Sequence, residues 1–97
     1  MKVFAISKLL SGATFKDIQP HISAEARNAW RLYKGGRLRE YYLRADDEPG
    51  VVFAFECEDV AQARALVNTF PMVKAGVIDF DLIPVGPLLS LEALFAT

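Results

Sequence analysis

The sequence predicts one α+β domain in which an antiparallel sheet carries both helices on a single face. Two observations support this fold class. Strand-like apolar stretches and segments of helical periodicity follow one another in the order βαββαβ, and turn-forming residues separate them. A chain of 97 residues is long enough for a single core, so we expect residues 1–97 to form one domain.

The first strand is predicted at residues 2–9, KVFAISKL. Its apolar side chains point to both sides, which favours a position in the middle of the sheet. Ser11 and Gly12 then provide a turn.

The first helix is predicted to begin near Asp17 and to end at Gly35-Gly36. Pro20 fits its first turn, where no backbone N–H is needed. Apolar residues recur at three- and four-residue spacings, the pattern of an amphipathic helix: Ile18, Ile22, Ala26, Ala29, Trp30 and Tyr33. The pattern predicts that Trp30 and Tyr33 belong to the core.

A β-hairpin is predicted next. Residues 37–44 (RLREYYLR) form a strand with tyrosines at its centre, residues 45–50 (ADDEPG) form a turn, and residues 51–56 (VVFAFE) form the returning strand.

The second helix is predicted to open at Asp59, with Gln62 three residues later as in a capping box, and to stop at Pro71. Residues 77–85 (VIDFDLIPV) alternate between apolar and acidic side chains, as in a strand with two different faces. Residues 88–95 are predicted to add a final turn of helix.

This order of elements specifies a ferredoxin-like βαββαβ sandwich, an antiparallel sheet with both helices on one face. The other face must then be solvated or covered by a second subunit. The chain is 53% hydrophobic, which favours coverage, so we expect a homo-oligomer, a dimer or larger.

Charge and composition exclude several classes of partner. Eleven basic and twelve acidic residues leave a net charge of −1, without the basic stripe that nucleic acids require. Apolar stretches are too short or too interrupted for a membrane span or a signal peptide. Cys57 is the only cysteine and agrees with a reducing compartment. We therefore expect a cytoplasmic protein that binds neither nucleic acid nor membrane.

Several weak motifs, in their order and spacing, resemble the muconolactone isomerase family of the dimeric α+β barrel superfamily. They are GRLREYYLR, VVFAFEC, FPM and IDFDLIPV, spread from Gly35 to Pro87. The resemblance implies that two ferredoxin-like sheets pair into a barrel, with a ligand pocket inside the barrel or between sheet and helices. It also implies a cofactor-free, metal-free isomerase that moves a proton on a small lactone.

Such a reaction needs a general base and a donor that stabilises the enolate oxygen. Strand alternation puts Leu38, Glu40, Tyr42 and Arg44 on one face. Glu40 is then the candidate base, Tyr42 the candidate donor, and Arg44 the candidate anchor for a substrate carboxylate. The competing interpretation is a soluble edge strand whose charges form cross-strand pairs. A catalytic Glu40 should be partly buried with a raised pKa, whereas a structural one should be exposed or paired.

Two further residues are candidates for substrate binding. His21, the only histidine, lies one turn before Glu25, so the two either form a proton-transfer pair or make a contact on the helix surface. Trp30 either belongs to the core or lines a ligand cavity.

The remaining acidic residues and the cysteine do not indicate a metal site or a reactive thiol. The aspartates Asp79 and Asp81, like the acidic turn at 46–48, are typical of a solvated face and a turn and do not specify a metal site. Glu56 and Glu58 flank Cys57 and would raise the pKa of its thiol, which argues against a reactive thiolate.

The sequence therefore predicts a small cofactor-free isomerase, or a related lyase-like enzyme, that transfers a proton on a small lactone or carboxylated substrate. The alternative is a non-catalytic module of the same barrel type that binds a small ligand or joins subunits.

Overall fold

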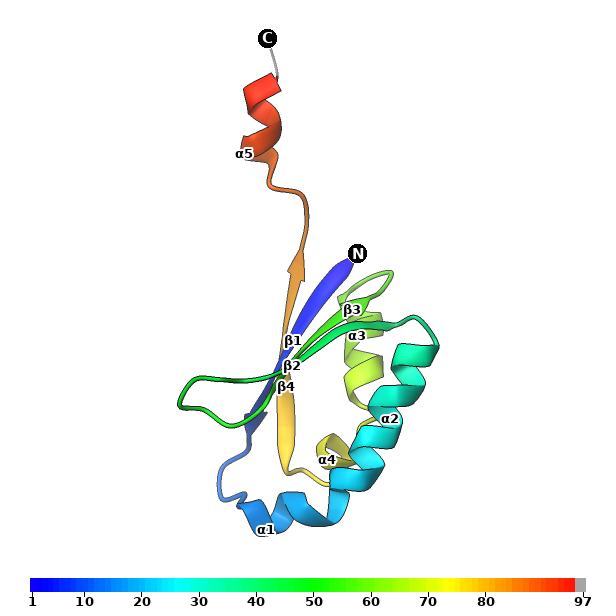
Figure 1. The fold of residues 1–97 in the computed structure, drawn as a ribbon, viewed down its shortest axis with the longest axis vertical. Helices are drawn as coiled ribbons and strands as arrows, with labels where there is room; N and C mark the ends of the chain where they lie inside the picture. The colour runs from blue at the N-terminus through cyan, green and yellow to red at the C-terminus, as the bar shows by residue number, and fades with distance from the viewer. Residues whose placement is uncertain (96–97) are drawn as a thin grey trace.

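The computed structural model describes residues 1–95 (Figure 1). The strands are β1 (Lys2–Leu9), β2 (Leu38–Leu43), β3 (Val51–Glu56) and β4 (Ile78–Val85). The helices are α1 (Phe15–Ile18), α2 (Ile22–Lys34), α3 (Val60–Val67), α4 (Pro71–Lys74) and α5 (Leu89–Glu92), with 3₁₀ turns at Gln19–His21 and Ala93–Phe95. This order confirms the predicted βαββαβ pattern and the short terminal helix.

The four strands form one antiparallel sheet in the order β2-β3-β1-β4. β1 lies between β3 and β4, as its two apolar faces predict; Ala5, for example, is opposite both Phe53 and Leu82. β2 and β3 form the expected hairpin. The ferredoxin-like arrangement is therefore confirmed.

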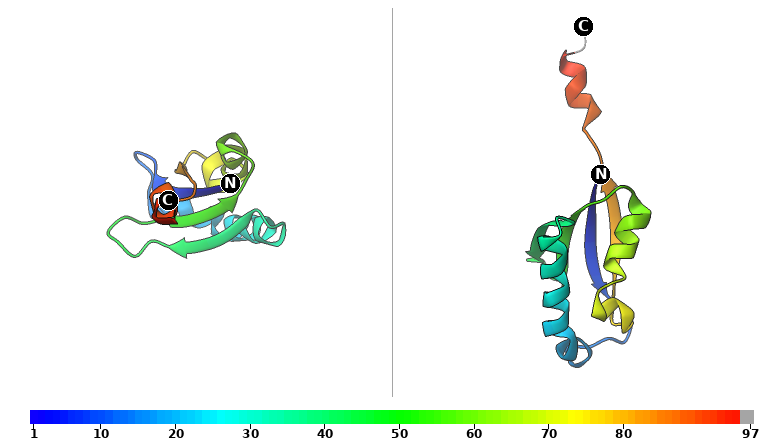
Figure 2. Two further views of the ribbon diagram at one scale, coloured as in Figure 1. Left: turned by 90° about the horizontal axis from the view of Figure 1, so that it is seen from above. Right: turned by 90° about the vertical axis from the view of Figure 1, so that its right-hand side faces the viewer.

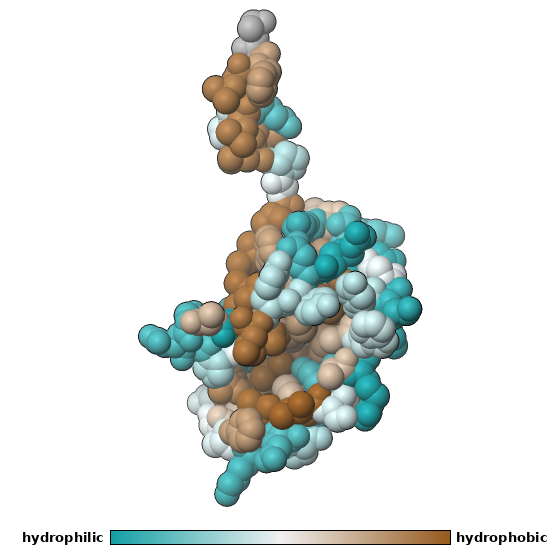
Figure 3. Space-filling view, in the orientation of Figure 1, coloured by the Kyte–Doolittle hydropathy of each residue, from teal (hydrophilic) through white to brown (hydrophobic). Residues whose placement is uncertain are grey.

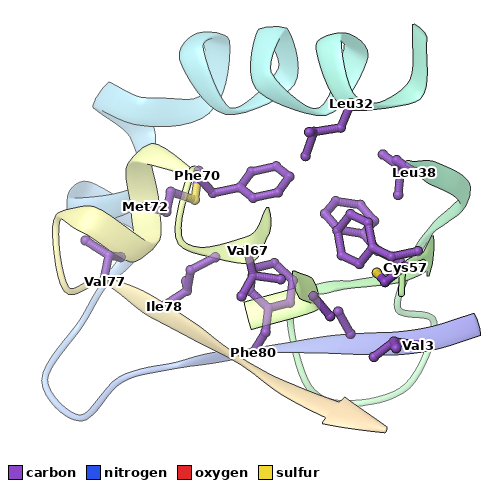
Figure 4. Packing of buried hydrophobic residues seen from close by; sticks show 14 residues of the cluster. Val3, Leu32, Leu38, Cys57, Val67, Phe70, Met72, Val77, Ile78 and Phe80 are labelled. Carbon is purple, nitrogen blue, oxygen red and sulfur yellow. The ribbon is translucent and has the colours of Figure 1, made fainter. Parts of the chain in front are cut away.

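The helices α2 and α3 lie on the same side of the sheet (Figures 1 and 2). Between them and the sheet is an aromatic cluster, in which the ring of Phe53 stacks on Phe70 and Phe80 with centroids 5.5 and 5.8 Å apart. Aliphatic side chains from the strands and helices complete the core (Figure 4), among them Val3, Leu32, Leu38, Val67, Met72 and Ile78. Burial of these side chains holds the two layers together.

The predicted helix ends are found with small differences. Asp59 caps α3 by accepting a hydrogen bond from the N–H of Gln62 at 2.8 Å. Gly36 has a φ of 80°, the left-handed conformation expected just after a helix. The first helix is interrupted, because the 3₁₀ turn that contains Pro20 separates α1 from α2.

The prediction that Trp30 and Tyr33 belong to the core is wrong. Their exposed fractions are 60% and 42%, whereas Leu32 on the same helix is 4% exposed. α2 packs beside β2, the strand at the edge of the sheet. The sheet therefore covers only part of the apolar face of α2, and the rings of Trp30 and Tyr33 lie at the surface.

The predicted alternation of β2 is also wrong at one point. The pairing with β3 shifts between Leu38 and Glu40, so that Leu38 is opposite Phe55 and Glu40 is opposite Ala54. This β-bulge puts Leu38 in the core and Glu40 and Tyr42 on the other face of the sheet.

The terminal segment beyond β4 projects away from the body (Figures 1 and 3), and the molecule measures 58 × 30 × 21 Å. We call residues 88–95 the arm. Its apolar side chains are 57 to 85% exposed: Leu88, Leu89, Leu91, Leu94 and Phe95. Among residues 1–95, none of the helices has the length and apolar character needed to cross a membrane.

The end of the hairpin turn is held tightly against β1. The hydroxyl oxygen of the buried Ser7 accepts a hydrogen bond from the N–H of Val51 at 2.8 Å. Gly50 has a φ of 147°, and a Cβ at this position would lie 2.5 Å from Ser7 Oγ. A larger residue here would be strained at this φ and would force Ser7 to move.

Gly50→Ala is therefore expected to lower the free energy of unfolding by about 2 kcal/mol or more, through strain and loss of the Ser7–Val51 hydrogen bond. Urea denaturation measures the change. Gly86→Ala is the control, because a Cβ there meets nothing within 4 Å. Equal stability of the two variants would contradict the steric argument.

Candidate functional site

A pocket of about 420 Å³ lies between the sheet and the segment that joins α1 to α2. Side chains from both layers line it, together with the end of the hairpin turn and the start of α4. Its lining residues are Ser7, Leu9, Phe15, Ile18, Ile22, Glu25, Leu43, Pro49, Gly50, Val51, Phe53, Met72 and Ile78. Only two of these, Ser7 and Glu25, carry polar side chains, so the pocket is an apolar cavity with two polar groups.

Glu25 is the ionisable residue of this pocket. α2 presents its carboxylate to the pocket, where Oε1 accepts a hydrogen bond from the N–H of Met72 at 3.0 Å. Met72 lies in the first turn of α4, where backbone N–H groups have no partner within the helix. Burial raises the pKa of Glu25, while the Met72 N–H and the nearby His21 lower it to a smaller extent.

Ser7 contributes the second polar group. It is 3% exposed and lies on the helix-facing side of β1. Because its oxygen already accepts from Val51, its O–H remains able to donate to a molecule in the pocket. The pocket therefore combines a carboxylate of raised pKa with a hydroxyl donor.

His21 lies in the 3₁₀ turn just before α2 and is partly buried. Its charge is close enough to affect the pKa of Glu25. It does not line the pocket itself, so it acts on the site only through Glu25.

Glu40 and Tyr42 lie on the open face of the sheet, away from the pocket. The Tyr42 hydroxyl donates to Glu40 Oε1 at 2.9 Å, and Lys2 Nζ donates to Glu40 Oε2 at 3.1 Å. The Lys2 hydrogen bond, followed by that of Tyr42, lowers the pKa of Glu40. Within the single chain, Glu40 thus has the features expected of a charge-paired residue.

Arg44 and Tyr42 line a shallow hollow of about 430 Å³ on the same open face. The guanidinium of Arg44 donates to both carboxylate oxygens of Asp46, at 3.0 and 2.5 Å. Asp46 therefore already binds the guanidinium of Arg44, the group predicted to bind a substrate carboxylate.

Trp30 lines a separate groove of about 240 Å³ between α2 and β2. Its ring stacks on Tyr33 at 5.6 Å, and Tyr33 meets Tyr41 edge to face at 5.6 Å. The five site residues predicted from the sequence therefore lie in three places. Glu40, Tyr42 and Arg44 come together on the open face, whereas Trp30 lies in its own groove and His21 lies beside α2.

Glu25 is the residue that sequence reasoning undervalued, since it was considered only as the neighbour of His21. A signal was present. Ile18, Ile22, Glu25 and Ala29 follow one another at spacings of four, three and four, so a carboxylate interrupts the apolar stripe that faces the sheet.

No protein-family model matches the chain, and no curated protein matches it. Among solved structures, the chain is similar to 5-chloro-2-hydroxyhydroquinone dehydrochlorinase from Burkholderia phenoliruptrix AC1100 in complex with 2,5-dihydroxybenzoquinone. The TM-score is 0.71 with 17% sequence identity, over 89% of this chain and 94% of that chain.

At this level of identity the similarity shows the fold. The chain shares with that dehydrochlorinase a small α+β fold, an antiparallel sheet with helices on one face, in agreement with the predicted fold class.

The environment of Glu25 predicts a pH-dependent cost in stability. A carboxylate whose pKa is raised on folding destabilises the native state when it is ionised, and this cost disappears as the pH falls through the raised pKa. Glu25→Gln should therefore melt higher than wild type at pH 8, by roughly 1–4 °C, and the difference should vanish near pH 4. Calorimetry at both pH values checks this. A variant that melts lower than wild type at pH 8 would show that the ionised carboxylate is stabilising.

Proposed function

We propose that the chain is a small cofactor-free enzyme that transfers a proton on an organic molecule held between the sheet and α2, with Glu25 as the general base. One observation carries this proposal: Glu25 is the one ionisable side chain among the residues that line the largely apolar pocket. The similar solved structure, named as a dehydrochlorinase and holding a quinone, supports a role in small-molecule chemistry.

The pocket contains the parts that such a reaction needs. A carboxylate with a raised pKa is a stronger base towards a carbon acid than an ordinary one, because its conjugate acid is weaker. The Met72 N–H fixes the position of Oε1, which leaves Oε2 to accept the proton. The Ser7 hydroxyl would donate to the oxygen on which negative charge develops.

The proton balance is simple. Glu25 removes a proton from carbon to give an enolate and a carboxylic acid. Return of the proton to another carbon of the same molecule completes an isomerisation, whereas loss of a leaving group from the enolate completes an elimination. The resemblance of residues 35–87 to muconolactone isomerases favours the first outcome, on a lactone.

A second candidate site lies on the open face. There Glu40 is the proposed base, Tyr42 the donor and Arg44 the anchor, and the Tyr42–Glu40 hydrogen bond is the observation that favours this site. This site needs a second subunit over the sheet to exclude water. Trp30 and His21 do not belong to this open-face site. Trp30 would bind a ligand in its own groove between α2 and β2, and His21 would act on the pocket through Glu25.

The alternative function is a module that binds a small ligand without turning it over. The same apolar pocket supports it. Turnover distinguishes the two functions.

We also propose that the chain works as a homo-oligomer. The open sheet face carries Phe4, Ile6, Ile83 and Val85, with Ile83 and Val85 46% and 37% exposed. The arm exposes a further set of leucines. Contact with a second copy would remove this apolar surface from water.

Variants of the two carboxylates test the choice of base. Muconolactone and its methyl ester are incubated with wild type, Glu25→Gln and Glu40→Gln, and turnover is followed by ultraviolet absorbance. Loss of the pocket base should lower kcat by about 10²–10⁴-fold. Glu58→Gln, at an exposed carboxylate before α3, is the control and should retain wild-type activity.

Activity lost in Glu40→Gln but kept in Glu25→Gln would move the base to the open face. If wild type turns over neither compound but binds one of them, the binding module is favoured.

The arm is tested by its effect on assembly. Wild type is expected to be a dimer or larger by light scattering, and Leu91→Lys should weaken the assembly about tenfold or more, since it puts a charge into an apolar contact. Ser90→Lys, on the neighbouring arm residue, is the matched control. A monomeric wild type, or equal effects of both substitutions, would contradict a role for the arm.

A further inference from the structure

We propose that the pocket beside Glu25 selects uncharged ring compounds and excludes carboxylates. The inference rests on the proposed function, because it concerns the same pocket. It narrows the substrate from "lactone or carboxylated" to a neutral lactone, phenol, quinone or similar ring.

The charge of the lining is the first observation. No lysine, arginine or histidine is among the residues that line this pocket, and its ionisable group is a carboxylate. A substrate anion would therefore meet no cation within the pocket and would lie near a like charge.

Three cationic side chains of β1 and of the hairpin end are paired with carboxylates. The stem of Arg44 passes close to Gly50 at the pocket wall, but its guanidinium is held by both oxygens of Asp46. Lys8 pairs with Asp81 at 2.7 Å, and Lys2 pairs with Glu40 on the opposite face of the sheet. His21 lowers the pKa of Glu25 slightly through its charge, and it does not line the pocket.

Transfer of an anion into this pocket is therefore unfavourable. An ionised carboxylate that leaves water without a cationic partner loses most of its hydration energy, whereas an amide, ester or hydroxyl loses much less. A neutral ring gains from burial against Ile18, Phe53 and Ile78. A hydroxyl or amide group on the ring can donate to Glu25, and a carbonyl or hydroxyl oxygen of the ring compound can accept from Ser7.

The size of the pocket agrees with a single ring. About 420 Å³ is at the lower end of the range usual for small-molecule sites. A cavity of about 150 Å³ already holds benzene, so this volume accommodates a substituted monocyclic compound whose oxygens could reach the two polar groups.

A matched pair of probes tests the inference on the full-length protein in its native assembly. 4-Methylbenzamide and 4-methylbenzoate have nearly the same shape and differ in charge at pH 7. Binding is followed by NMR through the methyl signals of Ile18, Met72 and Ile78, which line the pocket. The amide is expected to bind at least about tenfold more tightly than the carboxylate.

Glu25→Gln provides the second arm of the experiment. Removal of the like charge should raise the affinity for 4-methylbenzoate by a larger factor than the affinity for 4-methylbenzamide. The side-chain amide oxygen of this variant can still accept from the N–H of Met72, so the fold should persist, and the methyl spectrum of the free variant checks this.

The two possible failures are distinguishable. Equal or tighter binding of the carboxylate, with shifts at the pocket methyl groups, would overturn the neutral-ligand inference and leave the pocket as the binding site. If neither probe shifts these signals, the pocket is not the ligand site, and both the inference and the proposed function fall.

Discussion

The partly buried hydrogen bond between the N–H of Met72 and Glu25 is the interaction on which the proposed site depends. A carboxylate in an apolar pocket is costly unless a donor reaches it. The short helix α4 supplies that donor because the N–H groups of its first turn have no partner within the helix. The bond therefore links α2 to α4 and leaves a base whose pKa is raised by burial.

The two carboxylates considered as bases lie in opposite environments on the two sides of the sheet. Glu25 is half-buried in a pocket lined mainly by apolar side chains, and this burial raises its pKa. Glu40 receives hydrogen bonds from Lys2 and Tyr42, which lower its pKa. A difference in environment that moves the pKa values of two carboxyl groups apart is how proteins give residues of the same type different roles. The close approach of Gly50 to Ser7 brings the hairpin end onto β1 and forms one wall of the pocket beside Glu25.

The fold could be predicted because local signals agree: the alternation in residues 77–85, the cap at Asp59 and the glycine after α2 all specify the same topology. The site could not be predicted as well. A β-bulge at residues 38–40 changes which side chains of β2 share a face, and no pattern in the sequence predicts this bulge. The exposure of Trp30 depends on how far α2 overhangs β2, which is a tertiary property. Glu25 was visible as an interruption of an apolar stripe, but its donor, Met72, lies far along the chain.

The most direct test of the account is a titration of the glutamate side-chain carboxyl carbons by ¹³C NMR, with Glu25 assigned by comparison with Glu25→Gln. The account predicts that Glu25 titrates clearly above the ordinary value of 4.5, as expected for a carboxylate in an apolar pocket. Titration of Glu25 at or below 4.5 would show a solvated or ion-paired carboxylate and would contradict the proposal that it is the base.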